Sequence, residues 1–180
     1  VGGHPCLDVR STAILTLHRF AVVDANRGAM WLDDKTRAVL LRGTAADQSM
    51  EMRVMSFRVM TQLCLHVPNK ARLWQHMEMR ASLLGGACSG MPEEVRAAAL
   101  SILRSMAISS ENQVPIWQHD DARTLILGCT AADQPDGVRA WALRVLRNLA
   151  VSVDNQLLMW NHVETRAGIA SGCAFDQDEN

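Results

Sequence analysis

The chain has 180 residues, of which 48% are apolar and 21% charged, and its formal net charge is −1. This composition is typical of a packed protein and excludes a disordered chain, while the near-neutral charge argues against a dedicated nucleic-acid binder, whose domain is strongly basic. No apolar run approaches the roughly 18 residues that a membrane span requires, so we expect no membrane insertion.

A pattern of residues recurs four times along the chain, with a constant spacing of 43 residues. Self-similarity at a fixed period of this size is the signature of an array of helical repeats. We therefore expect one all-α domain over residues 1–180, with units at about 5–47, 48–90, 91–133 and 134–177. The recurring residues are a Val-Arg or Met-Arg pair at 9, 52, 95 and 138, an Asn at 26, 69, 112 and 155, a Trp at 31, 74, 117 and 160, and an Arg at 37, 80, 123 and 166.

Each unit opens with a stretch that predicts an amphipathic helix, over 9–23, 52–66, 95–109 and 138–152. Apolar or small residues stand at offsets 0, 4, 5, 8, 11 and 12 from the opening residue, as in Val138, Ala142, Leu143, Leu146, Leu149 and Ala150. These offsets form one stripe at a period of 3.6 residues, which gives a helix of about four turns.

The second part of each unit begins near the recurring Asn. Asn is a preferred N-cap because its side chain accepts a hydrogen bond from a free backbone N–H, so we predict that Asn26, Asn69, Asn112 and Asn155 are caps. A helix of about 16 residues then follows and ends near Gly43, Gly86, Gly128 or Gly172, since glycine tolerates a left-handed helix end. No break is evident inside this stretch.

The sequence begins and ends near unit boundaries, and its first helix has the pattern of an internal one. Terminal units of a repeat array need a polar outer face. We therefore expect either a longer native array or ends that are covered by a partner.

The last unit, with V-R-x-x-A-L-x-x-L-x-N-L-A followed by N-Q, resembles the armadillo repeat, and all four units fit this pattern; HEAT repeats are the near alternative. The second part lacks the usual armadillo Gly-Ala-Ile-Pro break, so two or three helices per unit remain open. The resemblance implies a right-handed α-solenoid of four 43-residue armadillo-like repeats, whose concave face binds a protein or an extended peptide.

Peptide-binding armadillo proteins carry a ladder of Trp and Asn at offsets 6 and 10 of the helix that lines this face. Here those offsets hold Leu15 and Arg19, Arg58 and Gln62, Ser101 and Ser105, and Arg144 and Asn148, of which only Asn148 matches. The resemblance therefore implies a concave-face site made of Arg19, Arg58, Gln62, Ser101, Ser105, Trp141, Arg144 and Asn148.

Several recurring residues have a structural explanation. The Trp residues are expected to fill the seams between units, and the Arg at 37, 80, 123 and 166 to hold carboxylates or helix-end carbonyls. The His residues at 76, 119 and 162 lie on stacked helices about 8–10 Å apart, too far to share one metal ion. No acid–base constellation recurs, so we expect no catalytic, metal or cofactor site. Five cysteines without a CxxC motif favour free thiols and an intracellular protein, cytoplasmic by default.

The clearest functional signal is charge. The four opening helices contain nine Arg and no Asp or Glu. Arg is also a good helix former that lies well beside a core, but a basic groove would bind an acidic or phosphorylated segment. We expect a non-catalytic protein-interaction scaffold; the alternative is a structural subunit within a larger assembly.

Overall fold

The computed structural model describes the backbone of residues 5–173 and the side chains of residues 9–173. Every regular element in this part is an α-helix, and there are twelve, so the all-α prediction is confirmed. The helices come in groups of three. The first of each group are α1 (Pro5–Val22), α4 (Met50–Leu63), α7 (Glu93–Met106) and α10 (Asp136–Leu149); the second are α2 (Asp24–Leu32), α5 (Val67–Gln75), α8 (Ser110–Gln118) and α11 (Val153–Asn161); the third are α3 (Asp34–Gly43), α6 (Met77–Ala87), α9 (Asp120–Gly128) and α12 (Val163–Cys173).

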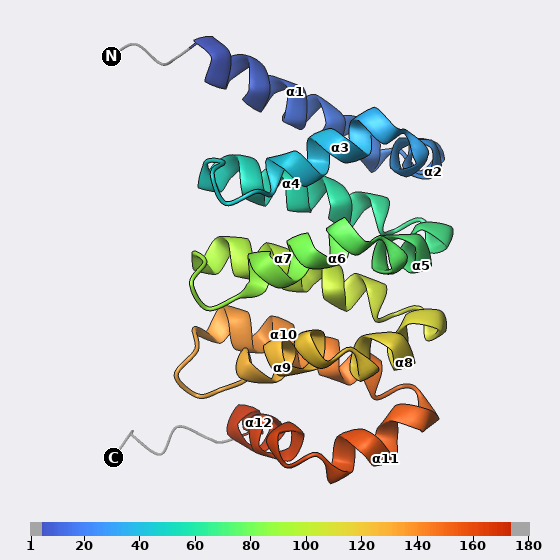
Figure 1. The fold of residues 1–180 in the computed structure, drawn as a ribbon, viewed down its shortest axis with the longest axis vertical. Coiled ribbons are helices and arrows are strands. Elements are labelled where there is room, and N and C mark those ends of the chain that lie inside the picture. Colours follow the sequence, from blue (N-terminus) through green and yellow to red (C-terminus); the bar gives the residue numbers. More distant parts are fainter. Residues whose placement is uncertain (1–4, 174–180) are drawn as a thin grey trace.

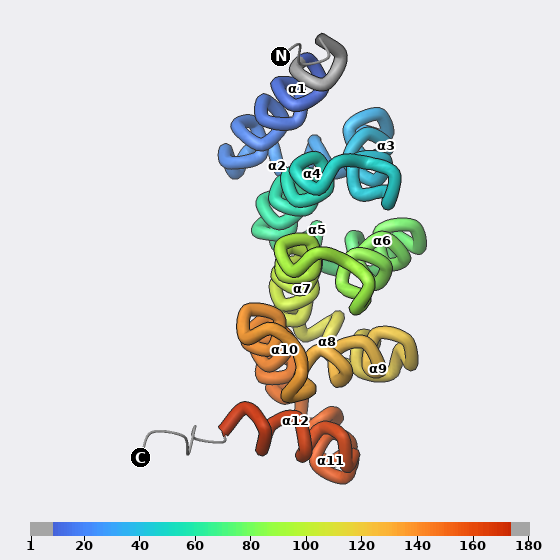
Figure 2. The backbone as a smooth tube through the Cα atoms, turned by 90° about the vertical axis from the view of Figure 1, so that its left-hand side faces the viewer, coloured from blue at the N-terminus to red at the C-terminus, as the bar shows by residue number. Residues whose placement is uncertain are grey.

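The groups stack on one another from the N-terminal to the C-terminal end of the molecule (Figure 1). From α2 onward, equivalent helices begin 43 residues apart, as at Met50, Glu93 and Asp136. Helices α1, α4, α7 and α10 lie side by side along one side of the stack, and α3, α6 and α9 lie along the other (Figure 2). Contacts between successive long helices are far more extensive than those between α3, α6, α9 and α12. We call α1, α4, α7 and α10 the inner row, because the contacts between successive helices are most extensive along it.

The core lies between these rows and runs the length of the stack. Its fully buried side chains come from all three helix types, for example Phe57 on α4, Ile116 on α8 and Ile126 on α9. Helices α4, α7 and α10 begin two residues before the predicted start and end three residues before the predicted end, whereas α1 begins four residues early and ends one residue early. Ser49, Pro92 and Pro135 are the N-caps of α4, α7 and α10.

The prediction of one 16-residue helix in the second part of each unit is wrong. One residue, Asp33, His76, His119 or His162, stands between two shorter helices. Its backbone is extended, with φ −72° and ψ 112° at His76, and the side chains of Asp33, His76 and His119 accept a hydrogen bond from the N–H three residues on. A single extended residue with a polar acceptor therefore divides the stretch into two capped helices.

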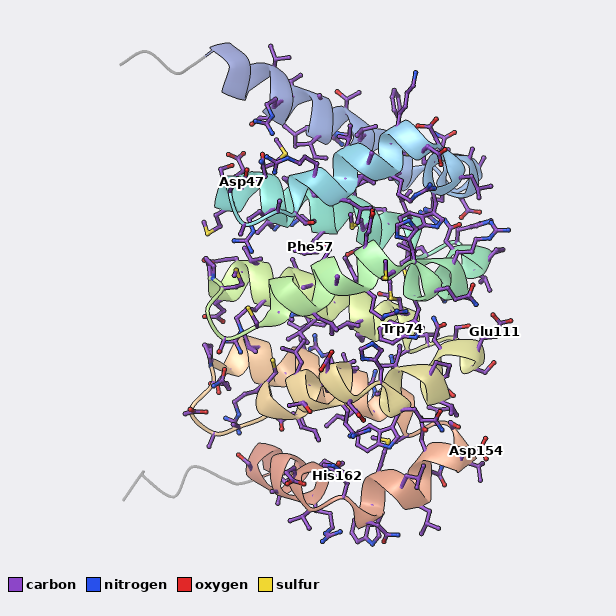
Figure 3. The ribbon with its side chains drawn as sticks, viewed as in Figure 1. Asp47, Phe57, Trp74, Glu111, Asp154 and His162 are labelled. Carbon is purple, nitrogen blue, oxygen red and sulfur yellow. The ribbon has the colours of Figure 1, made fainter. Side chains whose placement is uncertain are left out.

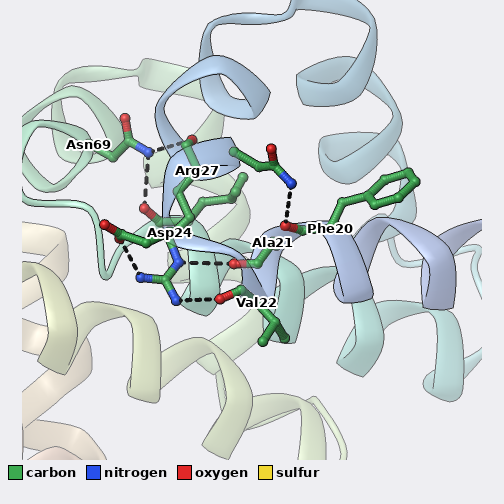
Figure 4. Close-up of polar contacts among 8 residues, drawn as sticks. Phe20, Ala21, Val22, Asp24, Arg27 and Asn69 are labelled. Carbon is green, nitrogen blue, oxygen red and sulfur yellow. Dashed lines mark hydrogen bonds and ion pairs between the residues drawn. The ribbon is translucent and has the colours of Figure 1, made fainter.

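The recurring Asn residues are not N-caps, so this prediction is also wrong. The caps are Val23, His66, Ser109 and Ser152, three residues earlier. The Asn side chain is a donor instead: Asn69 Nδ2 bonds the Leu63 carbonyl at the end of α4 and the Arg27 carbonyl of the preceding group, at 3.0 and 2.9 Å (Figure 4). Asn112 and Asn155 repeat both bonds. These amides bind consecutive groups together.

Candidate binding surface

Three of the recurring Trp side chains lie inside the seams between groups. Trp31, Trp74 and Trp117 are only 3–4% exposed, and Figure 3 shows Trp74 between the second and third groups. Each meets the His ring of the next group edge to face, with ring centroids 5.7 Å apart. The prediction that Trp fills the seam is confirmed at these three positions, whereas Trp160 is 67% exposed.

The recurring Arg residues contact the Trp side chains of their own groups. The guanidinium of Arg80 lies 5.5 Å from the centroid of the Trp74 ring and donates to the Trp74 carbonyl at 3.0 Å. Arg37 and Arg123 make the same two contacts with their own Trp residues. The expected pairing with helix-end carbonyls is confirmed, and these arginines are committed to the fold.

The nine Arg of the opening helices do not form one groove. Those that directly follow the opening residue turn toward the links between groups: Arg96 donates to the Ala87 carbonyl and to Gln134 Oε1, and Arg139 to the Ser171 carbonyl. Arg53 and Arg96 are only 7% and 5% exposed, and Arg10 bonds Gln48 Oε1. Arg10 and Arg96 thus bond the link that follows their own group, whereas Arg139 joins α10 to α12 within the fourth group. Arg53 and Arg96 are buried and therefore not available to a partner.

The other five arginines lie farther along the same helices of the inner row. None has a carboxylate of another described residue within 4.0 Å. All but Arg104 are exposed, and Arg104 is half-buried with an Nε that lacks a hydrogen-bond partner among the described residues. We call these five the basic surface: Arg19 on α1, Arg58 on α4, Arg104 on α7, and Arg144 and Arg147 on α10.

The predicted ladder residues differ in their availability. Arg19, Arg58 and Arg144 are exposed, and Gln62 and Ser101 are half-buried. Ser105 is 4% exposed and donates to the Ser101 carbonyl.

The last two predicted site residues lie on α10. Asn148 donates to the Arg104 carbonyl at 3.0 Å and so links α10 to α7. Trp141 is half-buried beneath Arg144, whose guanidinium lies 4.8 Å from the centroid of the indole ring. That stacking holds one cation in place.

The site predicted from the ladder offsets omits Arg104 and Arg147. Both stand at offset 9 from the opening residue, one position before the ladder. They were among the nine arginines of the charge pattern, which was therefore the signal that could have placed them. Because a helix turns 100° per residue, residues at offsets 6, 9 and 10 lie on one face, and the basic surface occupies that face.

The charges are separated along each long helix. Glu51, Glu93, Glu94 and Asp136 lie in the first turns of α4, α7 and α10, whereas the basic surface lies toward the C-terminal ends. The acids, and the three arginines in last turns (Arg19, Arg104 and Arg147), suit the helix dipole, which stabilises each by up to about 1 kcal/mol. The arginines of the basic surface can therefore serve two purposes. They can stabilise their own helices, and they can attract an acidic partner.

No protein-family model matches the chain, and no curated protein is significantly similar to it. None of the described helices is both long and apolar enough to cross a membrane. Among the described residues, no group of three or more His, Cys, Asp or Glu is arranged to hold a metal ion.

Proposed function

We propose that the chain is a right-handed α-solenoid of four armadillo-like repeats and acts as a non-catalytic protein-interaction scaffold. Its basic surface binds an acidic or phosphorylated segment of a partner protein. Two observations support the repeat family: from α2 onward equivalent helices begin 43 residues apart, and each group has three helices. Armadillo units have three helices and HEAT units two.

The observation that carries the binding proposal is the set of five arginines without a carboxylate partner among the described residues. They lie on four successive helices of the inner row. Packed helices are about 8–10 Å apart, so the surface spans about 24–30 Å. An extended peptide covers this distance with about seven to nine residues. Carboxylates or phosphates on such a peptide would receive charge-assisted, bidentate bonds from the guanidinium groups.

The test uses a short labelled peptide of glutamate and serine, prepared with and without phosphoserine, and fluorescence anisotropy. We expect saturable binding that weakens as NaCl is raised. Replacing Arg58 and Arg144 together by Ala should weaken binding by at least about tenfold, because each charge-assisted bond contributes about 1.5–3 kcal/mol.

The matched control replaces Arg42 and Arg72 by Ala. It removes the same charge from exposed positions on α3 and α5, outside the inner row, and should leave the affinity nearly unchanged. Equal losses in the two double variants would show that only net charge matters. An absence of binding by the unaltered chain would refute the basic surface as a site for acidic segments.

The alternative function, a structural subunit of a larger assembly, is favoured by a separate observation. Large apolar side chains are exposed at both ends of the described stack, among them Phe20 and Val22 at one end and Leu157, Trp160 and Ile169 at the other. Exposed apolar groups of this size are typical of surfaces that contact another protein.

A further inference from the structure

The two ends of the described stack each carry one half of an interior seam. Trp31, Trp74 and Trp117 are 3–4% exposed, but the equivalent Trp160 on α11 is 67% exposed. On the opposite side of the seam, Leu63, Met106 and Leu149 are fully buried, but Phe20, which stands at the same position in the first group, is 54% exposed. The residues that fill interior seams are therefore present at both ends.

The hydrogen bonds of the seam are also divided between the two ends. Asn69, Asn112 and Asn155 each bond a carbonyl of the preceding group, 42 residues earlier. Among the bonds of the described residues, the side chain of Asn26 makes only the bond to the Phe20 carbonyl within its own group. Gln156 on α11 stands 43 residues after Gln113. No described side chain donates a hydrogen bond to its carbonyl. Asn26 and Gln156 thus hold a matching donor and acceptor.

The shape of the two faces agrees with this division. A hollow of about 350 Å³ lies beside Phe20, Asn26 and Met30, on the face of α1 and α2. A smaller one, of about 130 Å³, lies beside Gln156, Trp160 and Arg166 on the face of α11 and α12. Thr165 lines the second hollow, is only 2% exposed, and its Oγ1 lacks a hydrogen-bond partner among the described residues.

The charges at the two ends are complementary. Arg123 of the third group and His162 of the fourth line one hollow between α9 and α12, so the recurring Arg and the residue between the short helices of the next group share a seam. At the ends of the described stack these positions hold Arg166 and Asp33. Asp33 is an exposed carboxylate where the other groups have His. Placing the two faces together would bring opposite charges to one seam.

We propose that the α11–α12 face of one copy of this chain binds the α1–α2 face of a second copy, head to tail, in the register of the interior seams. Trp160 then packs against the second copy's first group, Asn26 bonds the Gln156 carbonyl, and Asp33 approaches Arg166. Such a contact uses two different surfaces, so it adds copies in series and does not close into a symmetric dimer. It is independent of the basic surface.

The test measures the mass of the 180-residue chain by sedimentation velocity over a range of concentrations. The unaltered chain should form dimers and longer oligomers as concentration rises. Trp160→Ser and Phe20→Ser should each weaken this association by at least about tenfold, since a buried aromatic anchor dominates an interface. Both side chains are exposed, so circular dichroism should show an unchanged fold. Met77→Ser, an equally exposed apolar position on α6 within the stack, should leave association unchanged.

A mixture of the two variants identifies the mode of association. The Trp160→Ser chain keeps an intact α1–α2 face and the Phe20→Ser chain an intact α11–α12 face, so together they should form a 1:1 dimer and nothing larger. A chain that stays monomeric throughout, or a mixture that does not form the dimer, would overturn the proposal. Asp33→His should keep the association but make it much less sensitive to NaCl; an unchanged salt response would remove Asp33 and Arg166 from the contact and overturn the register.

Discussion

Replacement of Asn112 by Ala tests the role of the amide that joins successive groups. Asn112 is 2% exposed, and its Nδ2 donates to the Met106 carbonyl at 3.1 Å and to the Lys70 carbonyl at 2.9 Å. Each buried hydrogen bond contributes about 1 kcal/mol net, so the loss of both, with a small cavity, should cost about 2–3 kcal/mol. For a protein of this size that lowers the melting temperature by about 4–12 °C.

Asn26→Ala is the matched control, because Asn26 makes only the bond within its own group and is half-buried. It should cost about 1 kcal/mol. The assay is urea-induced unfolding followed by circular dichroism. Equal losses in the two variants would refute the claim that the bond between groups stabilises the stack.

Asn112→Asp tests whether the Asn112 side chain acts as a hydrogen-bond donor or as an N-cap. An N-cap is equally satisfied by Asp, whereas a carboxylate facing two carbonyls loses both bonds and leaves an unpaired buried charge. Asp should therefore destabilise the protein more than Ala does. An Asp variant as stable as the unaltered protein would restore the capping interpretation and contradict the hydrogen bonds of the structure.

Three further predictions follow from single side chains. His119→Asp should keep the N-cap and lose only the ring contact with the preceding Trp, and so cost about 1 kcal/mol less than His119→Ala in the same unfolding assay. The hydrogen bond from the Arg42 guanidinium is the main cause that lowers the pKa of Asp47 below its ordinary value of 3.8. The ionised Asp47 therefore contributes to stability above that value, and this contribution is lost as the pH falls through the lowered pKa. Carboxyl NMR should show the depressed titration, and Arg42→Ala should return it to the ordinary range. Burial raises the pKa of the Cys64 thiol to about 12, so thiol reagents with peptide mapping should modify exposed Cys173 in the native protein and Cys64 only after unfolding.

The all-helical class, the seam role of Trp and the pairing of the recurring Arg with helix-end carbonyls could be predicted from the sequence alone. A strict spacing of 43 residues places the same side-chain type at the same point of every unit. Helical periodicity then assigns the apolar stripe. A large aromatic that recurs beside this stripe has few places to go except the contact between units, and Trp31, Trp74 and Trp117 are found there.

The break in the second part of each unit could not be found in this way. Neither Gly nor Pro, the usual helix breakers, stands at this break, where a single extended residue separates α5 from α6. His76 caps the new helix through its ring nitrogen, with Nδ1 3.3 Å from the Met79 backbone nitrogen. The adjacent group supplies the ring contact with Trp31. That stabilisation exists only after groups are stacked.

The direction of the Asn hydrogen bond and the division of the arginines were decided by the tertiary structure. A side-chain amide can accept or donate. Asn69 donates to the Leu63 carbonyl of its own group and also to the Arg27 carbonyl, which another group brings to it. Likewise Arg96 and Arg104 belong to one helix and to one pattern of charge. The link that follows α9 engages the first, whereas no described carboxylate reaches the second. Local sequence determines what a side chain can do, and the neighbouring group in the stack determines which of these options it takes.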